Sequence, residues 1–263
     1  MYDLYQILLT IHGIAGAIGL AIFWRPVLAR KGGADHRRLG AWFARLMQLA
    51  GVTAVAMTLL LYIAPLQVRD GLALEPAQQQ ALLEQARRLA DLLLPLGLLL
   101  LANTRHGVLV LRARLDRSLL RQPSHQVLVA ALTLAGAYLL SQAWQFGGVL
   151  QWVFGGLCLG NAVSMWRYLY KPELRPGEWV IAHLGNLLGA GIAAHTAFLV
   201  FGGRSFLQHW VPEEMQLLLW IAPSAIGGLA ITVLSVVYRR RLGGRRRAPA
   251  KEASLAAYPA REA

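Results

Sequence analysis

The stretch EWVIAHLGNLLGAGIAAHTAFLVFG, residues 178–202, decides the fold class, because it is long and apolar enough to cross a lipid bilayer as one helix. Similar runs recur along the whole 263-residue chain, which is 56% hydrophobic and 15% charged. Soluble domains carry about 25% charged residues. The pattern predicts an all-α integral membrane bundle of seven transmembrane helices. The expected spans are 4–28, 42–66, 89–111, 127–146, 149–170, 179–201 and 216–238.

The loops between these spans predict the orientation of the bundle. Alternate loops are strongly basic, namely RKGGADHRRLG (30–40), RARLDRSLLRQPSH (112–125) and RRRLGGRRR (239–247). Basic loops stay on the cytoplasmic side, so we expect the N-terminus outside and the C-terminus inside a bacterial inner membrane. Topology then explains the net charge of +13, and no nucleic-acid partner is expected.

The chain divides into a transmembrane domain, 1–238, and a basic tail, 239–263. The tail is rich in Arg, Ala and Pro and is expected to be disordered. It either lies on anionic lipid or serves as a solvated topology anchor. Between the second and third spans, Pro76 is expected to begin an outer helix that runs into the third span. Nothing in the sequence indicates an oligomeric state.

Polar side chains inside the predicted spans are the functional candidates, since they are costly there and usually face the bundle interior. No Asp or Glu lies deep in any span, which argues against proton relays and acid–base hydrolysis. Imidazole binds metals and haem iron without a carboxylate. Cys158 is the only cysteine, so an intrachain disulfide and a CxxC motif are excluded. The candidates are His12, Asn103, Arg105, His106, Asn161, His183, Asn186 and His195.

Four of the histidines fall into two layers when depth is counted at ~1.5 Å per residue. His12 and His195 share an outer layer, and His106 and His183 share an inner layer about 18 Å away along one helix. This arrangement resembles a membrane cytochrome b with two b-type haems, each iron taking one His from each of two helices. Arg105 would hold a haem propionate or an anionic lipid, or would extend to the cytoplasm. Glycines would give the porphyrin room, namely Gly13, Gly16, Gly185 and Gly189.

The spacing of two of these histidines argues against the two-haem hypothesis. His183 and His195 are twelve residues apart, which leaves them about 120° apart around a straight helix. A single haem or metal site needs only one of the layers. In the preferred alternative, each His donates an interhelical hydrogen bond in a non-catalytic transporter, sensor or assembly partner. A third hypothesis is a zinc-dependent membrane hydrolase, with ligands drawn from His36, His106, His125 and His183.

Four segments carry a resemblance to a family. They are HLGNLLGAGIAAHTAFLV (183–200), LWIAPSAIGGLAI (219–231), IHGIAGAIGL (11–20) and DHRRLG (35–40). Together they resemble a seven-helix family of bacterial polytopic membrane proteins that is classed as a domain of unknown function. The resemblance implies a fold and a membrane location but no reaction. It draws attention to His12, His36 and His183, not to His195, and it implies that His36 and His183 are neighbours on the cytoplasmic side. These two residues are the candidate metal ligands.

Overall fold

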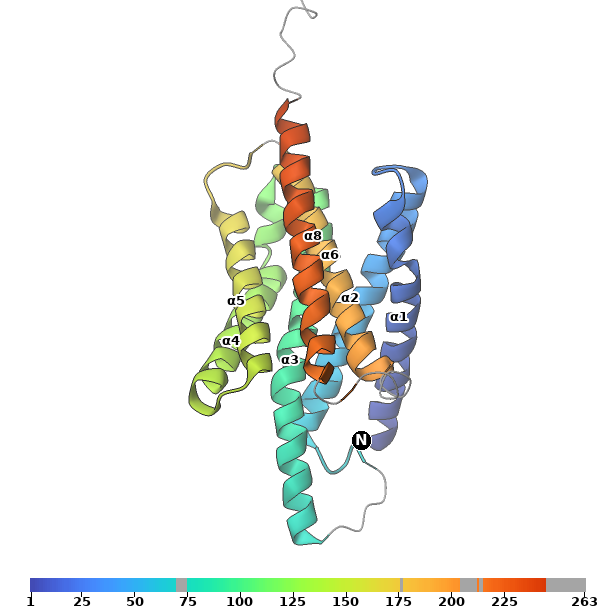
Figure 1. Ribbon diagram of the computed structural model, residues 1–263, viewed down its shortest axis with the longest axis vertical. Helices are drawn as coiled ribbons and strands as arrows, with labels where there is room; N and C mark the ends of the chain where they lie inside the picture. The colour runs from blue at the N-terminus through green and yellow to red at the C-terminus, as the bar shows by residue number, and fades with distance from the viewer. Residues whose placement is uncertain (70–74, 176, 204–211, 213–214, 245–263) are drawn as a thin grey trace, which may run out of the picture.

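The computed structural model describes residues 1–69, 75–175, 177–203, 212 and 215–244, and every regular element in these ranges is helical (Figure 1). Seven helices are long and apolar enough to cross a membrane, which confirms the predicted bundle. A short helix, η1 (Arg117–Arg121), connects the third to the fourth, and the sixth ends in a π-helical turn, η2 (Phe198–Gly202). The membrane-length helices are α1 (Tyr2–Leu28), α2 (Ala34–Ile63), α3 (Pro76–Ala113), α4 (Pro123–Phe146), α5 (Val149–Tyr170), α6 (Glu178–Ala197) and α8 (Gln216–Gly244).

Local sequence explains where several helices begin and end. Pro76 opens α3, where its fixed φ suits the first turn, and a capping box between Glu75 and Gln78 satisfies the free amides. The predicted helix that begins at Pro76 and runs into the third span is therefore confirmed, because α3 is continuous there and projects beyond its neighbours in Figure 1. Gly147 and Gly148 have φ of +75° and +117°. Only glycine adopts these angles without strain, so these two residues make the turn between α4 and α5.

Two predicted boundaries are wrong. The DHRRLG segment does not form a loop, because α2 begins at Ala34, and Asp35 in its first turn favours the positive end of the helix dipole. At the other end of the chain, α8 continues to Gly244 rather than ending at 238. The first residues assigned to the tail are therefore helical, and the rest of the tail, 245–263, lies outside the described residues.

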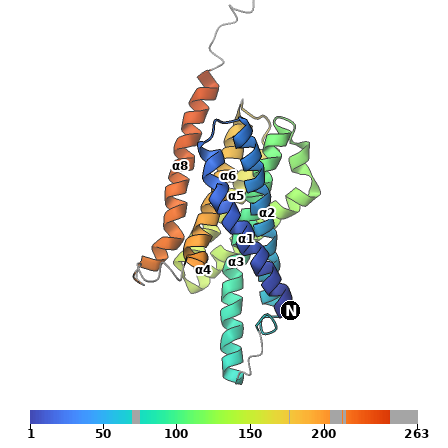
Figure 2. The ribbon, with the colours of Figure 1, turned by 90° about the vertical axis from the view of Figure 1, so that its right-hand side faces the viewer.

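Helix α3 lies at the centre of the bundle, where it packs against α2, α4, α5 and α6. The pairs α1–α2 and α4–α5 lie on either side of it (Figure 1), and α8 packs on α6 at the edge of the molecule (Figure 2). Large apolar side chains such as Ile7, Leu134 and Leu229 point outward and are exposed. Such a continuous apolar exterior is expected of a multi-pass protein whose surroundings are lipid.

The basic loops gather at one end of the bundle, which we call the basic end. It comprises the α1–α2 connection, η1 and the C-terminal end of α8 (Figure 1). Some of its arginines also form hydrogen bonds with backbone carbonyls. Arg121 Nη2 donates to Leu169 O at 2.9 Å, and Arg117 Nη2 donates to Pro172 O at 3.0 Å. Together they satisfy carbonyls at and beyond the last turn of α5, as cations near helix C-termini do.

Candidate functional site

A long cavity of about 1380 Å³ runs between α1, α2, α3, α5, α6 and α8. It extends from Tyr5 and Leu61 at the end that holds the N-terminus to Lys171 and Arg239 at the basic end. Pockets for small molecules usually measure roughly 300–1,000 Å³. The cavity is therefore large enough for an elongated ligand.

The cavity wall is mostly apolar, and different kinds of residues line its two ends. Near the N-terminal end of α5, away from the basic end, the ring of Trp220 lies 5.7 Å from that of Phe154 and 5.4 Å from that of Phe201, in edge-to-face contacts. At the basic end, the lining includes Lys171 and Glu178, which form a salt bridge of 2.6 Å. The cavity therefore has an aromatic end and a charged end.

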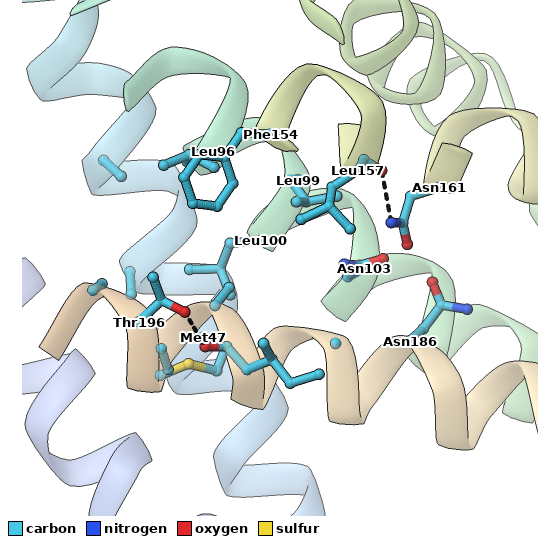
Figure 3. A pocket seen from close by; sticks show the side chains of 18 of the residues that line it. Met47, Leu96, Leu99, Leu100, Asn103, Phe154, Leu157, Asn161, Asn186 and Thr196 are labelled. Carbon is cyan, nitrogen blue, oxygen red and sulfur yellow. Dashed lines mark hydrogen bonds between the residues drawn. The ribbon is translucent and has the colours of Figure 1, made fainter. Parts of the chain in front are cut away.

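Three asparagines from three helices line the middle of the cavity: Asn103 of α3, Asn161 of α5 and Asn186 of α6. Figure 3 shows these side chains pointing toward one another. Asn103 is only 3% exposed, and its Oδ1 has no hydrogen-bond partner among the described residues. Buried polar atoms are normally paired, so this unpaired oxygen marks the place as a candidate binding site.

The other two amides have their orientation fixed by their own helices. Asn161 Nδ2 donates to Leu157 O, and Asn186 Nδ2 donates to Ala182 O, both at 2.8 Å. A carbonyl can only accept, so the amide nitrogen must lie on that side of each side chain. The Oδ1 atoms of both residues are therefore turned away from their own helix carbonyls, as Figure 3 shows.

His12 is one of the predicted site residues that line the cavity. Its Nδ1 lies 2.9 Å from Ala50 O on α2. Because the carbonyl accepts, Nδ1 carries the proton and Nε2 keeps its lone pair. Beside His12, a Cβ added to Gly13 or Gly16 would meet nothing within 4 Å. The open space predicted at these two glycines is present.

His195 lies in a different environment from His12. Its Nδ1 donates to Gly191 O of its own helix at 2.7 Å, and its ring packs against Phe23 at 5.2 Å and Trp24 at 5.7 Å between centroids. In the part of the chain that the structure describes, no hydrogen bond or ring contact joins His195 to His12. The pairing of His12 with His195 as ligands of one haem iron stays a prediction.

The inner histidine layer has different partners from the predicted ones. His106 Nδ1 lies 3.0 Å from His125 Nε2, and both rings are buried between α3 and α4. His183 Nδ1 instead donates to Gly107 O at 2.8 Å. Arg105 turns away from the cavity and donates from Nη2 to Ser124 Oγ at 2.7 Å. His106 and His183 therefore bond to different partners, and their pairing as ligands of one haem iron stays a prediction.

His36 and His183 are neighbours, as the resemblance implies, with ring centroids 6.5 Å apart. His36 Nδ1 donates to Pro26 O at 2.9 Å, so each of the two rings keeps an Nε2 lone pair. A zinc site needs at least three protein ligands. Within the described residues, no group of three or more His, Cys, Asp or Glu is placed to hold a metal ion. The four histidines of the zinc hypothesis form two separate pairs.

The sequence identified all three asparagines as polar residues within spans but did not indicate that they share one cavity. Every helical residue has a carbonyl four residues before it, so the sequence carried no signal for the outward-facing amide oxygens of Asn161 and Asn186. No family model, no curated protein and no solved structure matches this chain, so its membership of the family that it resembles stays a prediction.

Proposed function

We propose that this protein binds an amphipathic, lipid-like molecule in the long cavity and catalyses no reaction on it. The observation that carries the proposal is the cavity itself, about 1380 Å³ in volume and running lengthwise through the bundle. The hydrocarbon chain of such a ligand suits the apolar wall of the cavity, because it lies against leucine side chains without leaving any polar group unpaired. The asparagines would receive the polar part of the ligand.

We also propose the membrane in which the protein lies and its orientation there. The protein would lie in a bacterial inner membrane with its basic end toward the cytoplasm, because basic loops are retained there. Arg167, Lys171 and Arg239 line that end of the cavity. They would attract anionic lipid headgroups to its mouth, and the basic tail would add to the same field.

Filling the cavity at Gly160 is expected to block binding. Gly160 lines the cavity, and a Cβ added there meets nothing within 4 Å, so Gly160→Leu places a side chain in the ligand's space without straining α5. We expect affinity for a dibrominated stearyl alcohol to fall at least about 10-fold, or ~1.4 kcal/mol. Bromine quenches tryptophan on contact, and Trp220 lines the cavity. Binding is measured as saturable quenching of tryptophan fluorescence. The Trp220→Phe variant shows which part of the quenching comes from the cavity, because it should lose that part.

The matched control is Gly156→Leu. Gly156 lies one turn earlier on the same helix and is equally open at its Cβ, but it is not part of the cavity wall. This variant should bind the brominated alcohol as the wild type does. Equal binding by the Gly160 variant, or quenching of the wild type that never saturates, would contradict the proposed function.

A second candidate function, haem binding, is favoured by the surroundings of His12. Its Nε2 lone pair belongs to a cavity-lining ring beside the open space at Gly13 and Gly16, and iron takes its imidazole ligands in this way. This candidate predicts a Soret band that shifts on reduction with dithionite. His12→Ala should abolish the band, whereas His195→Ala should retain it. Colourless protein after haem-replete expression would rule out haem.

A further inference from the structure

We infer that Asn103, Asn161 and Asn186 select a ligand that donates hydrogen bonds, specifically the hydroxyl group of a neutral amphipathic alcohol. The inference rests on the proposed function and adds the chemistry of the ligand's polar group. It starts from one juxtaposition, in which three amide side chains from three helices face one another in the cavity (Figure 3).

These residues present amide oxygens and spare amide hydrogens to the cavity. Asn161 and Asn186 each use one hydrogen of their NH₂ group on a carbonyl of their own helix, at 2.8 Å, and their oxygens remain as acceptors. The buried Oδ1 of Asn103 is the acceptor without a partner in the described residues. It needs a ligand group that brings a hydrogen, such as a hydroxyl, whose oxygen can in turn accept from a spare amide hydrogen.

The charges around the cavity exclude the other kinds of donor. Arg167, Lys171 and Arg239 line its basic end. Glu178, the one carboxylate among the described lining residues, is already paired with Lys171 at 2.6 Å. An ammonium or a metal cation would enter without a counter-charge, which is costly in a medium of low dielectric constant. A neutral hydroxyl needs no such charge.

Groups that only accept hydrogen bonds fit this place less well than a hydroxyl. A carboxylate, a ketone or an ether could accept from the spare amide hydrogens but would leave the buried Asn103 Oδ1 without a donor. A site built to bond a hydroxyl rejects an analogue that lacks it for this reason. The asparagines would therefore set the depth at which the ligand's hydroxyl lies, while the apolar wall holds its chain.

Two probes with the same chain test this inference: dibrominated stearyl alcohol and its methyl ether. The ether keeps the oxygen as an acceptor but has no hydrogen to donate. We expect the alcohol to bind the wild type at least about 10-fold more tightly, measured by the saturable quenching of Trp220. In Asn103→Leu, which removes the unpaired buried oxygen, the alcohol should lose most of this advantage.

The methyl ether also reports on whether the variant is intact, because it should still bind Asn103→Leu saturably. Ser164→Ala is the control, since Ser164 is another polar residue of the cavity wall, and it should leave the preference for the alcohol unchanged. The inference is overturned if alcohol and ether bind the wild type equally, if Asn103→Leu keeps the full preference, or if Ser164→Ala abolishes it. Saturable binding of neither probe would instead overturn the proposed function.

Discussion

Gly136→Val should lower the free energy of unfolding by roughly 3 kcal/mol, at the upper end of the usual cost of over-packing. A Cβ at Gly136 would lie 2.8 Å from the Leu159 backbone nitrogen and 3.0 Å from Cys158 Cβ. Backbone atoms cannot move aside as a flexible side chain does, so α4 and α5 must separate. Membrane helices depend on such close contacts, because they gain no hydrophobic driving force from lipid.

Cys158, which faces Gly136, also contacts α3. It is fully buried, and its Sγ lies 3.6 Å from Pro95 O of α3. A shift of α5 away from Gly136 would therefore disturb its packing on α3 as well. Valine also adds two methyl groups beyond the Cβ, so the crowding exceeds that of alanine.

Equilibrium unfolding in mixed micelles with increasing SDS, followed by circular dichroism, would measure the effect. Gly156→Val is the control, because it makes the same change on α5 where nothing lies within 4 Å of the new Cβ. The control should stay within about 0.5 kcal/mol of the wild type. If Gly136→Val is too unstable to purify, Gly136→Ala gives a milder version of the same clash. Unfolding of both Gly136 variants at the wild-type midpoint would show that α4 and α5 do not approach so closely.

The fold class was predictable because a membrane imposes a simple rule. Every backbone amide that crosses lipid must be bonded within its own helix, so apolar runs of sufficient length predict the helices directly. The start of α2 at Ala34 was missed for a related reason. Hydropathy finds only the apolar part of a helix, whereas the polar segment DHRRLG continues the same helix beyond it.

The histidine partners were harder to predict, because depth along a helix can be read from sequence but direction around it cannot. His183 bonds to the carbonyl of Gly107, which is the residue next to His106. One residue turns the helix by about 100°. The predicted partner was therefore at nearly the right depth, but its side chain points to α4 and His125 instead. Helix rotation is set by packing against all neighbours at once.

The glycines show the same division between what was predictable and what was not. Gly13 and Gly16 do border open space, as predicted. At Gly185, however, an added Cβ would lie 3.8 Å from Ile231 of α8, and at Gly189 it would lie 3.3 Å from Asn103 Nδ2. Both glycines line the cavity, but a neighbouring side chain also lies beside each of them. Which neighbour reaches a glycine depends on how helices cross, and the sequence does not show this.

The pair His106 and His125 should respond to substitution as one unit. Replacing either with leucine leaves the other imidazole buried without its partner, and we expect each single variant to lose roughly 1–3 kcal/mol of stability. The double variant removes both polar groups from a site that is fully enclosed, with both residues at most 1% exposed. It should therefore lose clearly less than the sum of the two single losses.

The difference between the double and the summed single effects is the coupling energy, which for contacting residues reaches about 0.5–3 kcal/mol. The same SDS titration measures it. His195 supplies the control, because its imidazole bonds to Gly191 of its own helix and has no contact with His125 among the described residues. The cycle of His195→Leu with His125→Leu should be additive within about 0.5 kcal/mol. Additivity of the His106 and His125 variants as well would mean that the 3.0 Å hydrogen bond between their rings makes no contribution to the folded state.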